Sequence, residues 1–76
     1  MINQTSPLKS PPPRTRLRKA ILQADTEKGA ISRAAFTFGI DVATMSRILS
    51  GYTAPTDRQR AAMCTILKMT ERQLGI

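Results

Sequence analysis

The sequence predicts a compact all-α domain of four to five helices, and three observations lead to that prediction. Apolar residues recur at helical spacings along most of the chain, with glycines and capping residues between the runs. The 76 residues suffice for one domain with one small core. Hydrophobic residues make up 41% of the chain, aromatics only 4%, and Trp is absent. A core of Ala, Leu, Ile and Met suits a helical bundle better than a sheet.

The charge balance points to an acidic partner. Lys and Arg number 12 against 5 acidic residues, a formal net charge of +7. Such an excess is typical of nucleic-acid binding, with an acidic membrane surface as the alternative. Membrane binding would need a basic helix with a bulky apolar face, and no stretch shows that contrast strongly. Without a long apolar run or a secretory signal, we expect a cytoplasmic protein that does not bind membranes.

Few residues suited to catalysis or metal binding are present. The chain has no His and one cysteine, Cys64, which excludes an internal disulfide and a Cys-rich zinc site. We therefore expect no enzymatic activity, no catalytic residues, no metal and no cofactor.

The N-terminal part combines proline with positive charge. Residues 1–13 are polar and proline-rich and predict a flexible or semi-rigid arm ahead of a folded domain at residues 14–76. A basic cluster follows, which comprises Arg14, Arg16, Arg18 and Lys19. These cations are candidates for DNA phosphate contacts. The alternatives are a solubilising tail for the arm and a solvated face for the cluster.

A first helix is expected at Thr15–Ala24, and a pair of short helices at residues 30–51. In the first helix, the apolar face comprises Leu17, Ala20, Ile21 and Ala24. Residues 25–29 are predicted to form a turn. In the pair, the apolar stripes are Ile31, Ala34, Ala35 and Phe38, then Met45, Ile48 and Leu49. Gly39 can take the positive φ that closes a helix, Asp41 is placed to cap the helix from Val42, and Gly51 ends it.

This pair resembles the helix-turn-helix of the lambda repressor and Cro family, the XRE-type regulators. The resemblance rests on Ala35, Gly39, Ile40, Met45, the run Ser46-Arg47-Ile48, and Gly51 followed by Pro55, within residues 17–74. It implies a lambda-repressor-like DNA-binding domain whose second helix, at residues 42–50, enters the major groove of double-stranded DNA. One departure is Ile31, where the family usually carries a Gln that contacts a phosphate.

The resemblance and the helical geometry together give candidate DNA contacts. The outward residues of the second helix, proposed for base edges, are Val42, Ala43, Thr44, Ser46 and Arg47. Of these, Val42, Ala43 and Arg47 match the family's base-reading positions, although Val42 can also simply cover the edge of the core. Candidates for phosphate contact are Ser32 and Arg33 in place of the missing Gln, and Tyr52 and Thr53 in the following loop. Tyr52 can alternatively stack on the core.

The C-terminal third is expected to complete the core. Capping patterns at Thr56-Asp57-Arg58-Gln59 and Thr70-Glu71-Arg72-Gln73 each predict a helix start. The expected inner stripe of the first is Ala62, Met63, Ile66 and Leu67, with Cys64 as a small, partly buried hydrophobe. Phe36, at a position that the family leaves polar, has two interpretations: repacking beside the small Ala34, or a surface patch for a partner.

The function expected from this reading is a sequence-specific transcriptional regulator without catalysis. By its resemblance it would be a repressor of phage or Cro-like type, binding a palindromic operator as a homodimer. The alternative is a protein-interaction adaptor, for example of antitoxin type, that uses the same fold. A third and weaker interpretation is non-specific coating of nucleic acid.

Overall fold

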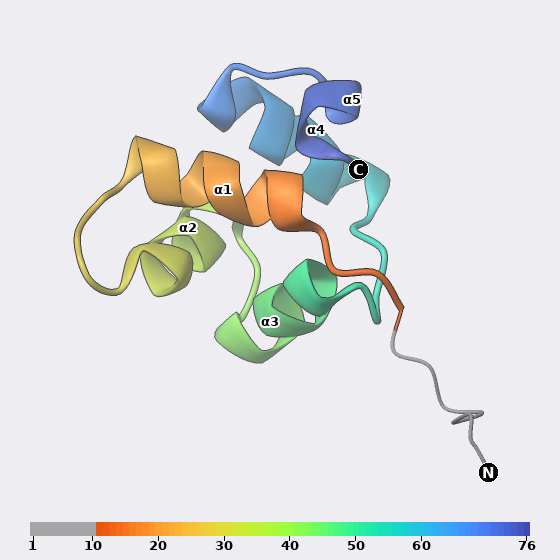
Figure 1. Ribbon diagram of the computed structural model, residues 1–76, viewed down its shortest axis with the longest axis horizontal. Helices are drawn as coiled ribbons and strands as arrows, with labels where there is room; N and C mark the ends of the chain where they lie inside the picture. Colours follow the sequence, from red (N-terminus) through yellow and green to blue (C-terminus); the bar gives the residue numbers. More distant parts are fainter. Residues whose placement is uncertain (1–10) are drawn as a thin grey trace, which may run out of the picture.

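The computed structural model describes residues 11–76, and this part of the chain contains five helices and no strand. The helices are α1 (Thr15–Ala24), α2 (Ala30–Phe38), α3 (Val42–Ser50), α4 (Asp57–Leu67) and α5 (Glu71–Leu74) (Figure 1). The expected all-α class is confirmed, and the predicted bounds of α1 and α3 agree with the structure. Of the predicted N-terminal arm, residues 1–10 lie outside the described residues.

Helix α1 is the centre of the arrangement, because it contacts every other helix. In Figure 1 it crosses the middle of the molecule, with α2 and α3 on one side and α4 and α5 on the other. Helix α3 packs only against α1 and α2, and it does not contact α4 or α5. One side of α3 is therefore left uncovered by the other helices.

The core is built from small and aliphatic side chains of all five helices. Its fully buried large members are Leu17, Ile21, Met45, Ile48, Leu49, Met63 and Leu74. Ala35 is completely buried where α2 packs against its neighbours, and partly buried residues such as Ile31 and Ala34 extend the core. The predicted stripes of α2 and α3 are thus confirmed.

Two residues of the predicted stripes are exposed. Ala24 is exposed at the last position of α1, where the chain turns away. Ile66 is 44% exposed, and Cys64 packs against the core in its place. The reason is that apolar residues stand next to one another in α4. Two sets of apolar positions, shifted by one residue, therefore both have the spacing of a helix face. The partial burial expected of Cys64 is confirmed.

Both predicted capping patterns are formed. The side chains of Thr56 and Gln59 bond reciprocally to each other's backbone N–H at the start of α4, with distances of 3.1 and 2.9 Å. Thr70 and Gln73 do the same at α5. These caps satisfy amide donors that the helices leave unpaired. Within residues 11–76, no helix has the length and apolar character needed to cross a membrane.

Candidate nucleic-acid interface

The outer face of α3 is made of small side chains and one arginine. Burial of Met45, Ile48 and Leu49 turns the opposite side of the helix outward. The exposed residues on that side are Val42, Ala43, Ser46 and Arg47. Val42 is 52% exposed, so it partly covers the core edge and partly faces outward. A long cationic side chain among small neighbours can reach beyond the helix surface without obstruction.

The start of α3 is closed by Asp41, as predicted. One carboxylate oxygen of Asp41 accepts a hydrogen bond from the Thr44 backbone N–H at 3.1 Å, and the other accepts from the Thr44 hydroxyl at 2.6 Å. Both bonds lower the pKa of Asp41, and the bond from the Thr44 hydroxyl has the larger effect. The Thr44 hydroxyl is therefore already a donor within the protein, so a base would find it only as an acceptor. A phosphate at this helix end would meet the Asp41 charge.

The start of α2 differs, because no side chain caps it. Gly29 precedes the helix with a positive φ of 85° and has no side chain that could accept a hydrogen bond from the first amides. Ser32, a predicted phosphate contact, is exposed on the first turn. The first amides of α2 thus have no side-chain acceptor, and helix starts of this kind can hold anions.

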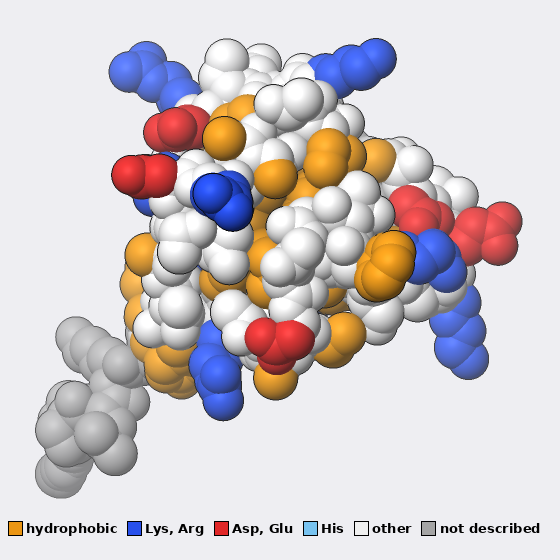
Figure 2. All heavy atoms as spheres, turned by 180° about the vertical axis from the view of Figure 1, so that it is seen from behind, with side chains coloured by type: hydrophobic (Ala, Val, Ile, Leu, Met, Phe, Trp, Pro, Cys, Tyr) orange, Lys and Arg blue, Asp and Glu red, His pale blue; other side chains and the backbone are white. Residues whose placement is uncertain are grey.

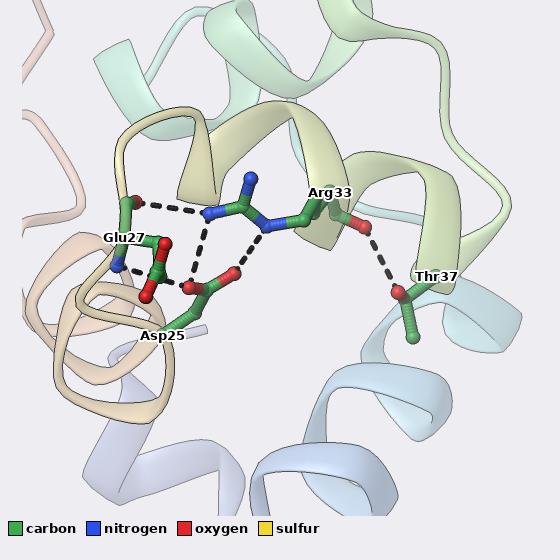
Figure 3. Close-up of polar contacts among 4 residues, drawn as sticks. All are labelled: Asp25, Glu27, Arg33 and Thr37. Atoms are coloured by element: carbon green, nitrogen blue, oxygen red, sulfur yellow. Dashed lines mark hydrogen bonds and ion pairs between the residues drawn. The ribbon is translucent and has the colours of Figure 1, made fainter.

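Arg33, the other predicted phosphate contact on α2, has an internal partner. Its Nε and Nη2 donate to the two carboxylate oxygens of Asp25 at 2.6 and 3.0 Å, and Nη2 also reaches the Glu27 carbonyl at 3.0 Å. Figure 3 shows this fork closing the turn between α1 and α2. Hydrogen bonding from Arg33 lowers the pKa of Asp25. A phosphate would have to displace Asp25 to bind Arg33.

Arg14 is joined to the far end of α3. Its backbone N–H donates to the Leu49 carbonyl at 2.8 Å, and its Nη1 donates to the carbonyls of Ile48 at 2.6 Å and Thr53 at 2.9 Å. Just before it, the backbone of Pro12 lies against Gly51, where an added Cβ would overlap the Pro12 carbonyl oxygen. Sequence reasoning missed this junction, because no local pattern signals a contact between segments so far apart in the chain.

The predicted basic cluster is dispersed in space. Arg16 donates from Nη1 to the carbonyl of Arg72 at 3.2 Å, so it is directed towards α5, which does not touch α3. Arg18 and Lys19 are exposed on α1. On the face seen in Figure 2, the Lys and Arg side chains stand apart, and acidic side chains lie beside some of them.

The loop after α3 keeps its two candidates near the surface. Tyr52 is 63% exposed and is not one of the buried core residues. Its backbone N–H donates to the Arg47 carbonyl at 3.0 Å, which fixes the start of the loop. Thr53 is half-buried.

No protein-family model matches the chain, and no match is found among curated proteins or solved structures. Among the described residues, no group of three His, Cys, Asp or Glu side chains comes together in a way that could hold a metal ion.

Phe36 projects from the outer side of α2 and is 87% exposed. The repacking interpretation is wrong, because Ala35 and Phe38 occupy the inward positions and Phe36 points away from them. Its exposure is what the alternative interpretation, a surface for a partner, requires.

Proposed function

We propose that the protein is a sequence-specific double-stranded DNA-binding regulator similar to the lambda repressor and Cro family. In this proposal α2 and α3 act as a helix-turn-helix, and α3 enters the major groove. The observation that carries it is the placement of α3, which is held through one side by α1 and α2. Its other side presents Arg47 among small residues. A major groove admits a helix of this kind, and each base pair offers a distinct pattern there.

The proposed base contacts use the exposed residues of α3. Arg47 would donate to O6 and N7 of a guanine, and Ala43 and Val42 would meet thymine methyl groups. Ser46 would bond a base edge or a phosphate. Thr44 is assigned a smaller part, as an acceptor only, because its hydroxyl donates to Asp41.

Phosphate contacts are assigned to the two ends of the helix pair. Ser32 and the uncapped amides of α2 lie at one end of the helix pair, and the loop with Tyr52 and Thr53 follows the other. Arg18 and Lys19 add exposed charge on α1, and the net charge of +7 favours approach to DNA. Arg33 and Arg16 are assigned structural parts instead, because of their bonds to Asp25 and to α5.

The proposed mechanism is occupancy of an operator by a homodimer. One domain of this size makes few base contacts, and two half-sites about 34–36 Å apart double them. A bound dimer would repress by excluding polymerase.

Selection of bound sites from a random duplex library tests the proposal. The expected result is an enriched palindromic motif with guanine at a fixed position in each half-site. The enriched duplex should keep its advantage over mixed-sequence DNA as salt is raised, although both affinities fall. Recovery of random sequence at equal affinity would refute specific binding and leave non-specific coating.

A second candidate, a protein-interaction adaptor, is favoured by the exposure of Phe36. An aromatic side chain that is 87% exposed is uncommon away from an interface. If the adaptor function is correct, the library selection returns no motif. If the DNA-binding function is correct, Phe36→Ser leaves the affinity of each half-site unchanged.

A further inference from the structure

Arg14 holds two parts of the proposed DNA-binding surface together. Its Nη1 donates to the Ile48 carbonyl in the last turn of α3 and to the Thr53 carbonyl in the loop that follows. Ile48 and Thr53 lie on either side of Gly51 in the sequence. The distances from Arg14 Nη1 to their carbonyl oxygens are 2.6 and 2.9 Å. One partly buried cation thus bridges the helix proposed to read bases and the loop proposed to contact phosphates.

The bridge matters because the covalent connection between these parts is a glycine. Gly51 has a φ of 89°, in a region that other residues rarely adopt, and glycine restrains its own backbone less than any other residue. The loop is otherwise fixed by the backbone bonds of Gly51 to Ile48 and of Tyr52 to Arg47. Pro12 packs against Gly51 from the outside. Arg14 and Pro12 therefore hold the junction from the N-terminal side.

Arg18 provides a contrast within the same basic cluster. It lies one helical turn further along, is exposed, and makes no side-chain hydrogen bond or ion pair with the described residues. A phosphate can reach Arg18 without competition, whereas at Arg14 it would compete with two backbone carbonyls. The two arginines therefore differ in their partners: Arg14 is bonded to backbone carbonyls, and Arg18 is exposed.

We propose that Arg14 is a positioning residue, which fixes the distance between the base-reading face of α3 and the phosphate-contacting loop. This inference rests on the proposed DNA-binding function. In this role Arg14 acts through Ile48 and Thr53 and does not touch the nucleic acid. It explains why the guanidinium turns back onto the protein although it belongs to a strongly basic segment.

The test compares Arg14→Lys with Arg18→Gln on the selected duplex and on mixed-sequence DNA over a range of salt concentrations. Lysine keeps the charge, but its side chain is shorter and its ammonium is more strongly hydrated than the guanidinium whose Nη1 bonds both carbonyls. We expect Arg14→Lys to lower the ratio of specific to mixed-sequence affinity by about tenfold, with an unchanged salt slope. Arg18→Gln should lower the salt slope by about one and leave the ratio unchanged.

Amide hydrogen exchange of the free protein separates positioning from a general loss of stability. In Arg14→Lys, the hydrogen-bonded amides of Gly51 and Tyr52 should exchange faster. The equivalent amides of Gly39 and Ile40, which close α2 with the same bonding pattern, should not change. Equal acceleration at both helix ends would overturn the inference, because it would indicate a general loss of stability.

The outcomes also separate this inference from the proposed function. One outcome is that the wild-type protein prefers a sequence while Arg14→Lys keeps both the affinity and the ratio of specific to mixed-sequence affinity. That result refutes the positioning role and shows that only the charge of Arg14 matters. If the wild-type protein prefers no sequence, the proposed function itself fails.

Discussion

Helices α2 and α3 have the same length and the same closure, but the rest of the molecule holds them differently. Each has nine residues and ends at a glycine of positive φ, with return bonds from Ile40 to Ala35 and from Tyr52 to Arg47. Helix α2 contacts α1, α3 and α4, whereas α3 contacts only α1 and α2. Because α3 has fewer neighbouring helices, one of its sides is left uncovered by the rest of the helices.

The ends of α3 compensate for its smaller packing surface. Asp41 caps its start, while Arg14 and Pro12 hold its last turn. The start of α2 has no side-chain cap, and its glycine closure at Gly39 is open to solvent, with no atom within 4 Å of an added Cβ. Helix α2 is therefore stabilised by its inner side chains and by the bonds of Arg33 at its start, and α3 by its inner side chains and both ends.

The largest expected effect concerns the inner side of α2. Phe38 is buried and Phe36, two positions earlier, is 87% exposed. Phe38→Ala should lower the free energy of unfolding by about 3–5 kcal/mol, because it removes a packed ring and leaves a cavity. Phe36→Ala should change it by less than about 0.5 kcal/mol. Urea denaturation followed by circular dichroism measures both, and similar losses would mean that the two faces of α2 are wrongly assigned.

The second prediction compares the two closing glycines. Gly39→Ala should cost about 1 kcal/mol from the positive φ alone. Gly51→Ala adds an overlap with Pro12 and should cost about 2–4 kcal/mol in total. Thermal unfolding of both variants gives the difference. Equal losses would show that the segment before α1 does not pack against the end of α3.

The smallest expected effect concerns the cap of α3 and its dependence on pH. The pKa of Asp41 is lowered in the folded protein, so its stabilising contribution is present above about pH 3.8 and is lost as the pH falls through the folded pKa. Asp41→Asn keeps a capping side chain but does not titrate. The melting temperature of the variant should therefore decline less steeply below pH 4 than that of the wild-type protein. Parallel curves would show that the Asp41 carboxylate is not held by Thr44.

Much of the fold could be predicted because its signals are local. Asp41 and Gly51 mark the two ends of α3, and the spacing of Met45, Ile48 and Leu49 marks its inner side. The inner side of α4 could not be fixed in the same way, because Met63 has apolar neighbours on both sides. Only packing against the other helices decides that Cys64 turns inward and Ile66 outward.

The candidate site was harder to predict, because the partners of charged side chains depend on tertiary structure. Arg14 bonds to residues 34 and 39 positions away, which no spacing rule could indicate. Arg33 and Asp25 are only eight positions apart, but the turn between them had to be known before the pair could be expected. The bond from Thr44 to Asp41 did have a signal, since residues three apart at a helix start often form a cap.

The most direct test of the central claim is the affinity of Arg47→Ala for the selected duplex and for versions of it changed at single base pairs. Arg58→Ala, which removes the same charge from α4 and away from α3, is the control. We predict that Arg47→Ala costs about 1–3 kcal/mol and abolishes preference at one base pair of each half-site, while Arg58→Ala leaves every preference intact. An unchanged pattern of base preferences in Arg47→Ala would contradict the placement of α3 in the major groove.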